Sequence, residues 1–123
     1  MTDWRQRLQE HKRQSACRIT TRGRRTGRPH TVTIWFVVGE NDRIHLGTLR
    51  LRRDWPKNIA VNPEVEIEIG DLRLKGEANR VTDPEQCKHI AGLLAQKYWA
   101  ARIGSWLGFK PQAIFEIRLS AAA

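Results

Sequence analysis

A basic segment over residues 50–58 is the part of this sequence best suited to hold an anionic ligand. Its cations lie between the end of a predicted strand and the start of a predicted helix. The first N–H groups of a helix have no partner within the helix, and the positive end of the helix dipole lies there, so such a position stabilises a phosphate. An aromatic ring beside the cations can wall a pocket for a flat ligand. The candidate binding residues are Arg50, Arg53, Trp55, Lys57 and Asn58.

Side-chain nucleophiles and metal ligands find little support in the sequence. None of the three serines lies in a nucleophile-elbow motif. Cys87 and His89 are two positions apart on a predicted helix, so their side chains do not face each other. The four histidines are scattered without the spacing of metal ligands. We therefore expect the reactive group to be a bound cofactor.

The charge balance points to an anionic partner. The chain has 123 residues, enough for one domain, and its 22 Lys and Arg against 13 Asp and Glu give a formal net charge of +9. Such a balance favours nucleic acid, a membrane surface or a phosphorylated, carboxylated small molecule. The two cysteines lack zinc-site or disulfide spacing and are expected to be reduced. With no secretory leader and no apolar run of about 18 residues, we expect a cytoplasmic protein without an integral membrane segment.

The order of predicted elements indicates an α+β protein that is mainly antiparallel β. In the segment 30–38, apolar residues fall on both faces, which is typical of a central strand. A helix over 52–61 takes Asp54 as its N-cap, and another begins at Asp83-Pro84, with Gly104 as its stop. About six strands then form a small barrel with flanking helices. The expected strands are 16–21, 30–38, 43–48, 65–69, 72–76 and 113–119; residues 1–15 form an N-terminal helical segment, and 16–120 form the barrel domain.

The register of one hairpin can be derived from its turn. If Gly70-Asp71 is a two-residue turn, Ile69 pairs with Leu72, and the following pairs continue in step. One face is then apolar, and the other sets opposite charges across from each other, as in Glu68 and Arg73. A slip by one residue would turn the glutamates into the core, so the register is well specified.

Two motifs resemble a known family. They are the hairpin sequence TTRGRRTGRP at 20–29 and the pair Lys57-Asn58 followed by Asn62-Pro63-Glu64-Val65. Both resemble the flavin/deazaflavin oxidoreductase superfamily, relatives of pyridoxamine phosphate oxidase, and most of all its deazaflavin-dependent nitroreductase branch. The resemblance covers roughly residues 16–119. It implies a split β-barrel homodimer that binds FMN or the deazaflavin coenzyme F420 at the subunit interface.

The same resemblance implies a reaction and a place for each ligand. The reduced cofactor passes a hydride to a small electron-poor acceptor, as in nitroreductases and ene-reductases. F420 is favoured over FMN because its oligoglutamate tail suits the arginines of the 20–29 hairpin. The cofactor-binding residues are expected to be Thr31, Thr33, Trp35, Leu46, Gly47 and Thr48 beside the ring, with Arg50, Arg53, Trp55, Lys57 and Asn58 near the phosphate. The expected substrate-binding residues are Tyr98, Trp99 and Trp106.

Other functions remain open from the residues alone. The same fold serves FMN-dependent oxidoreductases and FMN- or haem-binding proteins, with His30, His45 or His89 as a possible haem ligand. A basic barrel that binds nucleic acid is a further alternative, since arginines can follow phosphates while exposed aromatics stack on bases. Against it, Trp35 and Phe36 lie in a run that is expected to be too apolar to face solvent.

Overall fold

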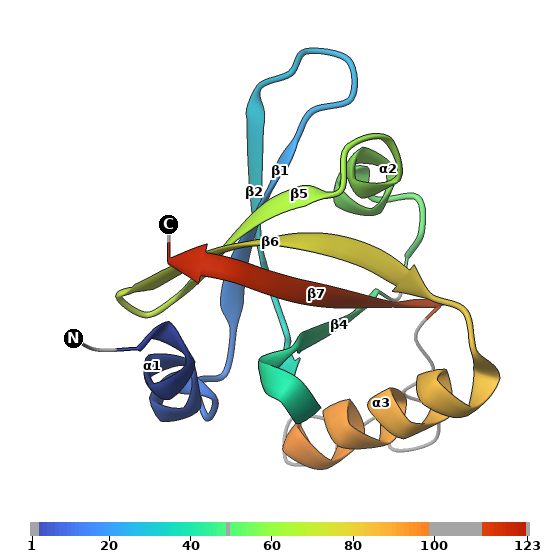
Figure 1. Ribbon diagram of the computed structural model, residues 1–123. Coiled ribbons are helices and arrows are strands. Elements are labelled where there is room, and N and C mark those ends of the chain that lie inside the picture. Colours follow the sequence, from blue (N-terminus) through green and yellow to red (C-terminus); the bar gives the residue numbers. More distant parts are fainter. Residues whose placement is uncertain (1–2, 49, 99–111, 123) are drawn as a thin grey trace.

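The computed structural model describes residues 3–48, 50–98 and 112–122, which form one curled antiparallel sheet with flanking helices (Figure 1). In the described residues the sheet has seven strands in the order β2-β1-β5-β6-β7-β4-β3. The strands are β1 (Cys17–Arg22), β2 (Pro29–Ile34), β3 (Val37–Val38), β4 (Ile44–Thr48), β5 (Glu64–Ile69), β6 (Leu72–Val81) and β7 (Ala113–Ala122). The helices are α1 (Trp4–His11), α2 (Asp54–Val61) and α3 (Pro84–Lys97), with a short 3-10 turn η1 (Glu40–Asp42).

The expected α+β split-barrel class is confirmed, but one strand differs from its prediction. The segment 30–38 is not a central strand: it divides into β2 at one edge of the sheet and β3 at the other. Its two faces meet different surroundings, because Val32 and Ile34 pack against the main core while Thr31 and Thr33 are exposed. Apolar residues on both faces therefore did not mean burial on both. The same break raises the strand count from six to seven.

The β5–β6 hairpin has the predicted register. Ile69 pairs with Leu72, Glu68 with Arg73, and the ladder continues in step to Glu64. The inward-facing side chains are buried and the glutamates lie on the outer face, wholly or partly exposed. Alternation and turn type were sufficient here because both are local properties of the chain.

The helix starts follow local capping rules with one exception. Asp3 caps α1 by accepting from the N–H of Arg5, and Asp83 caps α3 by accepting from the N–H of Gln86. The N-cap of α2 is Arg53 rather than Asp54, and its side chain makes no capping hydrogen bond. None of the described helices is long and apolar enough to cross a membrane.

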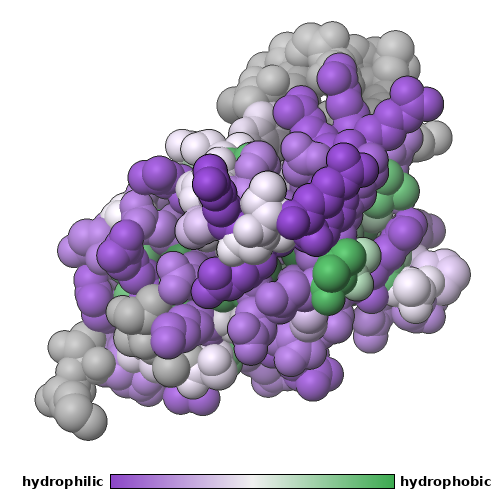
Figure 2. Space-filling view, turned by 90° about the horizontal axis from the view of Figure 1, so that it is seen from above, coloured by the Kyte–Doolittle hydropathy of each residue, from purple (hydrophilic) through white to green (hydrophobic). Residues whose placement is uncertain are grey.

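Two hydrophobic clusters stabilise the fold. The main core fills the inside of the curled sheet and includes Leu8 of α1, Phe36 and Trp55. The second cluster lies under α3 and consists of Val81, Ile90, Leu94, Tyr98 and Ile114, with Val37 and Cys87 packed against it. Seen from the side of α2 and the β1–β2 loop, the surface is mainly hydrophilic with small separate hydrophobic areas (Figure 2).

Candidate cofactor site

The start of α2 carries cations with no acidic partner among the described residues. Arg50, Arg53 and Lys57 are exposed and belong to none of the ion pairs of the described chain. Pro56 takes the third helical position and has no N–H, so the donors left without a helical partner are the N–H groups of Asp54 and Trp55. Unpaired cations and free N–H groups together form a suitable place for a phosphate.

Asn58 has a different task from the one its sequence position suggested. Its side chain is buried, Nδ2 donates to Thr21 Oγ1 at 3.1 Å, and Oδ1 accepts from the backbone N–H of Arg24 at 3.1 Å. The Arg24 guanidinium donates to the same oxygen at 3.0 Å. The amide is therefore occupied within the protein, and it fastens the β1–β2 loop to α2.

Arg24 was expected, with the other arginines of the 20–29 hairpin, to meet the cofactor tail, but its side chain has partners within the protein. Besides Asn58, its guanidinium lies 3.3 Å from the carboxylate of Asp54. Asp54 is the acid nearest in sequence to the cations of α2, so this ion pair offsets a negative charge that would repel a phosphate. The sequence signal was present only as an arginine in the loop, because the contact joins residues 30 positions apart.

Three expected site residues place their side chains in the interior instead. Trp55 is only 3% exposed and packs edge-on against Phe115, with ring centroids 5.2 Å apart, so its indole is not the open pocket wall that we expected. Leu46 is fully buried in the main core. Thr48 is buried, and its hydroxyl accepts from the N–H of Arg50 at 3.1 Å and donates to the carbonyl of Arg50 at 3.0 Å. On β4, Leu46 and Thr48 share the inner face, which leaves Gly47 facing outward.

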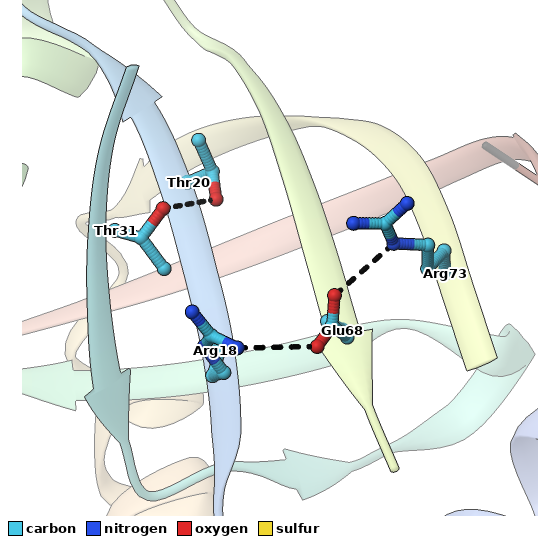
Figure 3. A network of polar contacts seen from close by, with 5 residues as sticks. All are labelled: Arg18, Thr20, Thr31, Glu68 and Arg73. Atoms are coloured by element: carbon cyan, nitrogen blue, oxygen red, sulfur yellow. Dashed lines mark hydrogen bonds and ion pairs between the residues drawn. The ribbon is translucent and has the colours of Figure 1, made fainter. Parts of the chain in front are cut away.

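The outer face of β2 gathers the other expected ring contacts. Thr31 and Thr33 lie on β2, and Trp35 directly follows its last residue in the same alternation; all three are exposed, Trp35 by 38%. The Thr31 hydroxyl forms a hydrogen bond with that of Thr20 on β1 (Figure 3), and the two oxygens are 2.7 Å apart. The exposure of Trp35 corrects the expectation that its run is too apolar to face solvent. The structure thus brings these three residues to one face.

Gly47 comes to the same side of the sheet near the point where the strands separate. Val37 pairs with His45, so the two share a face, and Gly47 lies two residues further along β4. The β3–β4 ladder ends at Val37, and β2 and β4 then run apart (Figure 1). We term this divergence of β2 and β4 the fork.

Tyr98 and His45 are both enclosed. Tyr98 is 6% exposed and its ring is stacked on Trp35, with centroids 4.3 Å apart and planes at 3°. Burial lowers the pKa of His45, and an added Cβ on Gly39 would lie 2.5 Å from its Nε2. An imidazole enclosed in this way does not suit an axial haem ligand. Trp99 and Trp106, the other expected substrate contacts, lie outside the described residues.

Comparisons with known proteins agree on the fold and the family. Among solved structures, an F420-H2 dependent reductase (FDR-A) is 20% identical with a TM-score of 0.67, covering 85% of this chain and 94% of that one. A structure described as a domain-swapped dimer has the same identity and TM-score, with 85% and 80% covered. A pyridoxamine 5'-phosphate oxidase-like protein from Listeria innocua is 12% identical with a TM-score of 0.71, and 98% and 97% are covered. These likenesses show the fold.

The family is shown by the sequence itself. A search of curated proteins found no match. The model of the F420H(2)-dependent quinone reductase family matches residues 6–102, which is most of the chain. The protein therefore belongs to the F420H(2)-dependent quinone reductase family and is an oxidoreductase that uses the deazaflavin coenzyme F420.

Proposed function

We propose that this protein reduces a quinone with F420H2 and holds the cofactor phosphate at the start of α2. The family to which the chain belongs supports a quinone as the acceptor. When bound, the reduced deazaflavin ring supplies the hydride, so the protein needs no side-chain nucleophile. The chain's own residues bind the cofactor, orient the acceptor and exclude water.

The observation that carries this proposal is the set of unpaired cations beside an uncapped helix start. Arg50, Arg53 and Lys57 donate to the phosphate, and the N–H groups of Asp54 and Trp55 complete its coordination. The ion pair between Arg24 and Asp54 supports the assignment, because it offsets the acid of the first helical turn. Charge-assisted hydrogen bonds of this type are the stronger ones in proteins. The residues present therefore fit the group.

The ring and the tail of the cofactor have separate places in this proposal. The ring lies against the outer face of β2, with Thr31, Thr33 and Trp35 on one side and Gly47 across the fork. A glycine there allows close approach because it has no Cβ. The carboxylates of the tail meet the exposed arginines at the end of β1 and in the β1–β2 loop, which are Arg22, Arg25 and Arg28.

We further propose that the protein acts as a homodimer in the cytoplasm. A structural neighbour described as a domain-swapped dimer supports dimerisation, and so does β2, an edge strand with one side unpaired among the described residues. Cys17 and Cys87 are free thiols, which is typical of a reducing compartment. A sedimentation-velocity mass equal to one chain at micromolar concentration would count against the dimer.

The test is equilibrium binding of F420 to the wild type and to the double variant Arg53→Ala, Lys57→Ala. We expect the dissociation constant to rise about 100-fold, because each charged phosphate contact contributes roughly 1.5 kcal/mol or more. Affinity of the wild type should also fall between 50 and 300 mM salt. The matched control is Arg73→Ala, Lys88→Ala, which removes the same charge elsewhere and should leave the constant within about twofold. Equal affinity of the double variant and the wild type would move the phosphate to another site.

A further inference from the structure

The chain breaks between β2 and β3 at Trp35 and Phe36, and this break has unusual partners. Neither residue belongs to a strand, and their side chains take opposite directions: Phe36 is fully buried in the main core, whereas Trp35 is exposed by 38%. Backbone groups that leave a ladder in a buried place need other hydrogen-bond partners. Here these partners come from the C-terminal end of α3.

Two consecutive side chains fasten the backbone of Phe36. The Tyr98 hydroxyl accepts from the N–H of Phe36 and donates to its carbonyl, each at 3.0 Å. The Lys97 ammonium donates to the same carbonyl at 2.9 Å and to the carbonyl of Lys12, after α1, also at 2.9 Å. Both residues are more than 60 positions from Phe36 in sequence. They supply the hydrogen bonds that the backbone of Phe36 would otherwise form with a neighbouring strand.

Tyr98 and Lys97 also contact the aromatic rings of the two residues at the break, Trp35 and Phe36. The Tyr98 ring is stacked on Trp35 at 4.3 Å, and the Lys97 Nζ lies 3.6 Å from the centroid of the Phe36 ring. Stacked aromatic pairs and cation–π contacts both stabilise the relative orientation of the groups that they join. Burial lowers the pKa of Lys97 to about 8, so at pH 7 the ammonium form still predominates. The C-terminal end of α3 therefore binds both the backbone of Phe36 and the rings of Trp35 and Phe36. We term Tyr98 and Lys97 together the clamp.

We propose that Tyr98 and Lys97 are positioning residues for hydride transfer, which hold the Trp35 ring in a fixed orientation at the cofactor site. This rests on the proposed function, in which Trp35 lies beside the deazaflavin ring. A small displacement of reacting groups lowers the rate of transfer far more than it lowers affinity. Loss of the clamp therefore lowers kcat while leaving cofactor affinity almost unchanged.

The test uses two variants that keep most of the packing. Tyr98→Phe retains the stacked ring and loses the hydroxyl, and Lys97→Met retains an apolar stem and loses the ammonium. For each purified protein we would measure the F420H2 dissociation constant and the kcat and KM for a soluble naphthoquinone at pH 7. We expect kcat to fall about tenfold in each, with the dissociation constant and KM within about threefold. Lys97→Arg, which keeps charge and donors, should recover part of kcat.

A matched control separates positioning from general stability. Cys87 packs against the same second cluster, but its described hydrogen bond goes to the carbonyl of Val81 and not to the backbone of Phe36, so Cys87→Ala should lower the melting temperature and leave kcat unchanged. Wild-type kcat in both Tyr98→Phe and Lys97→Met would overturn the proposal. So would a fall in kcat for Cys87→Ala of the same size, or a loss of affinity as large as the loss of kcat.

A further variant distinguishes this inference from the proposed function. If Trp35→Leu leaves both the F420H2 affinity and kcat at wild-type values, the deazaflavin ring does not lie beside Trp35. The proposed ring site is then overturned together with the positioning role of Tyr98 and Lys97. If Trp35→Leu lowers kcat or affinity while the Tyr98 and Lys97 variants do not, the site stands and the positioning role is overturned.

Discussion

Two charged regions of this protein use arginine in opposite ways. Three residues on the outer face of the sheet, Arg18, Glu68 and Arg73, form what we term the paired face, in which one carboxylate lies between two guanidinium groups (Figure 3). The nitrogen–oxygen distances are 3.4 Å to Arg18 and 3.1 Å to Arg73. At the other region, which we term the basic end (Arg50, Arg52, Arg53 and Lys57), no cation has an acidic partner among the described residues. The net charge of +9 is therefore not spread evenly over the molecule.

The contrast shows which charges are free to meet a ligand. Cross-strand pairs on a sheet satisfy each other and contribute only modestly to stability. Cations gathered at a helix start without partners repel one another and lower stability unless an anion joins them. The basic end is thus a feature that folding alone does not explain, and this supports its assignment to a phosphate.

The largest effect on the difference between the two regions is expected from removing Asn58, which fastens the β1–β2 loop to α2 beside the basic end. Asn58→Ala deletes a buried amide and leaves the N–H of Arg24 and the hydroxyl of Thr21 without this partner. We expect the free energy of unfolding to fall by about 1–3 kcal/mol, measured by urea denaturation. Asn79→Ala, an exposed amide that bonds only to Glu77 among the described residues, should stay within about 0.5 kcal/mol. Equal values for the two variants would contradict the anchoring role of Asn58.

A smaller effect is expected when the basic end loses its internal counterbalance. Arg24→Met breaks the ion pair with Asp54 and leaves that carboxylate beside the proposed phosphate. The dissociation constant of F420 should rise about fivefold, equivalent to about 1 kcal/mol. The second change Asp54→Asn, added to Arg24→Met, should recover most of the affinity, measured by titration calorimetry. No recovery would mean that Arg24 contacts the cofactor directly.

The smallest effect is expected on the paired face. Glu68→Gln leaves Arg18 and Arg73 without their shared carboxylate, yet Arg18 and Arg73 are well exposed to solvent. Stability should change by less than about 1 kcal/mol, and F420 affinity should stay within about twofold. Thermal melting and binding at low salt provide the measurements. Arg18 is the cross-strand partner of Thr33, which we place beside the deazaflavin ring, so an affinity change as large as that of Arg24→Met would show that the cofactor extends over the paired face.

Much of the fold was predictable because its signals are local. The β5–β6 register followed from a two-residue turn and alternation, and the start of α3 followed from Asp83 and Pro84. The family motifs led correctly to the split barrel and to F420. The cations of α2 were also found from sequence, since charge and position next to a helix start are visible there.

The individual roles at the site were less accessible. The sequence alone determined most of the elements, the starts of several of them and the unequal distribution of charge, because turn types, caps and alternation depend on neighbouring residues. Only the tertiary structure decided that 30–38 divides between two edges, that Trp55 packs inward and that Asn58 is used internally. The physical reason is that burial and hydrogen-bond partners depend on which distant segment covers a face, as when Tyr98 and Lys97 fasten the backbone of Phe36.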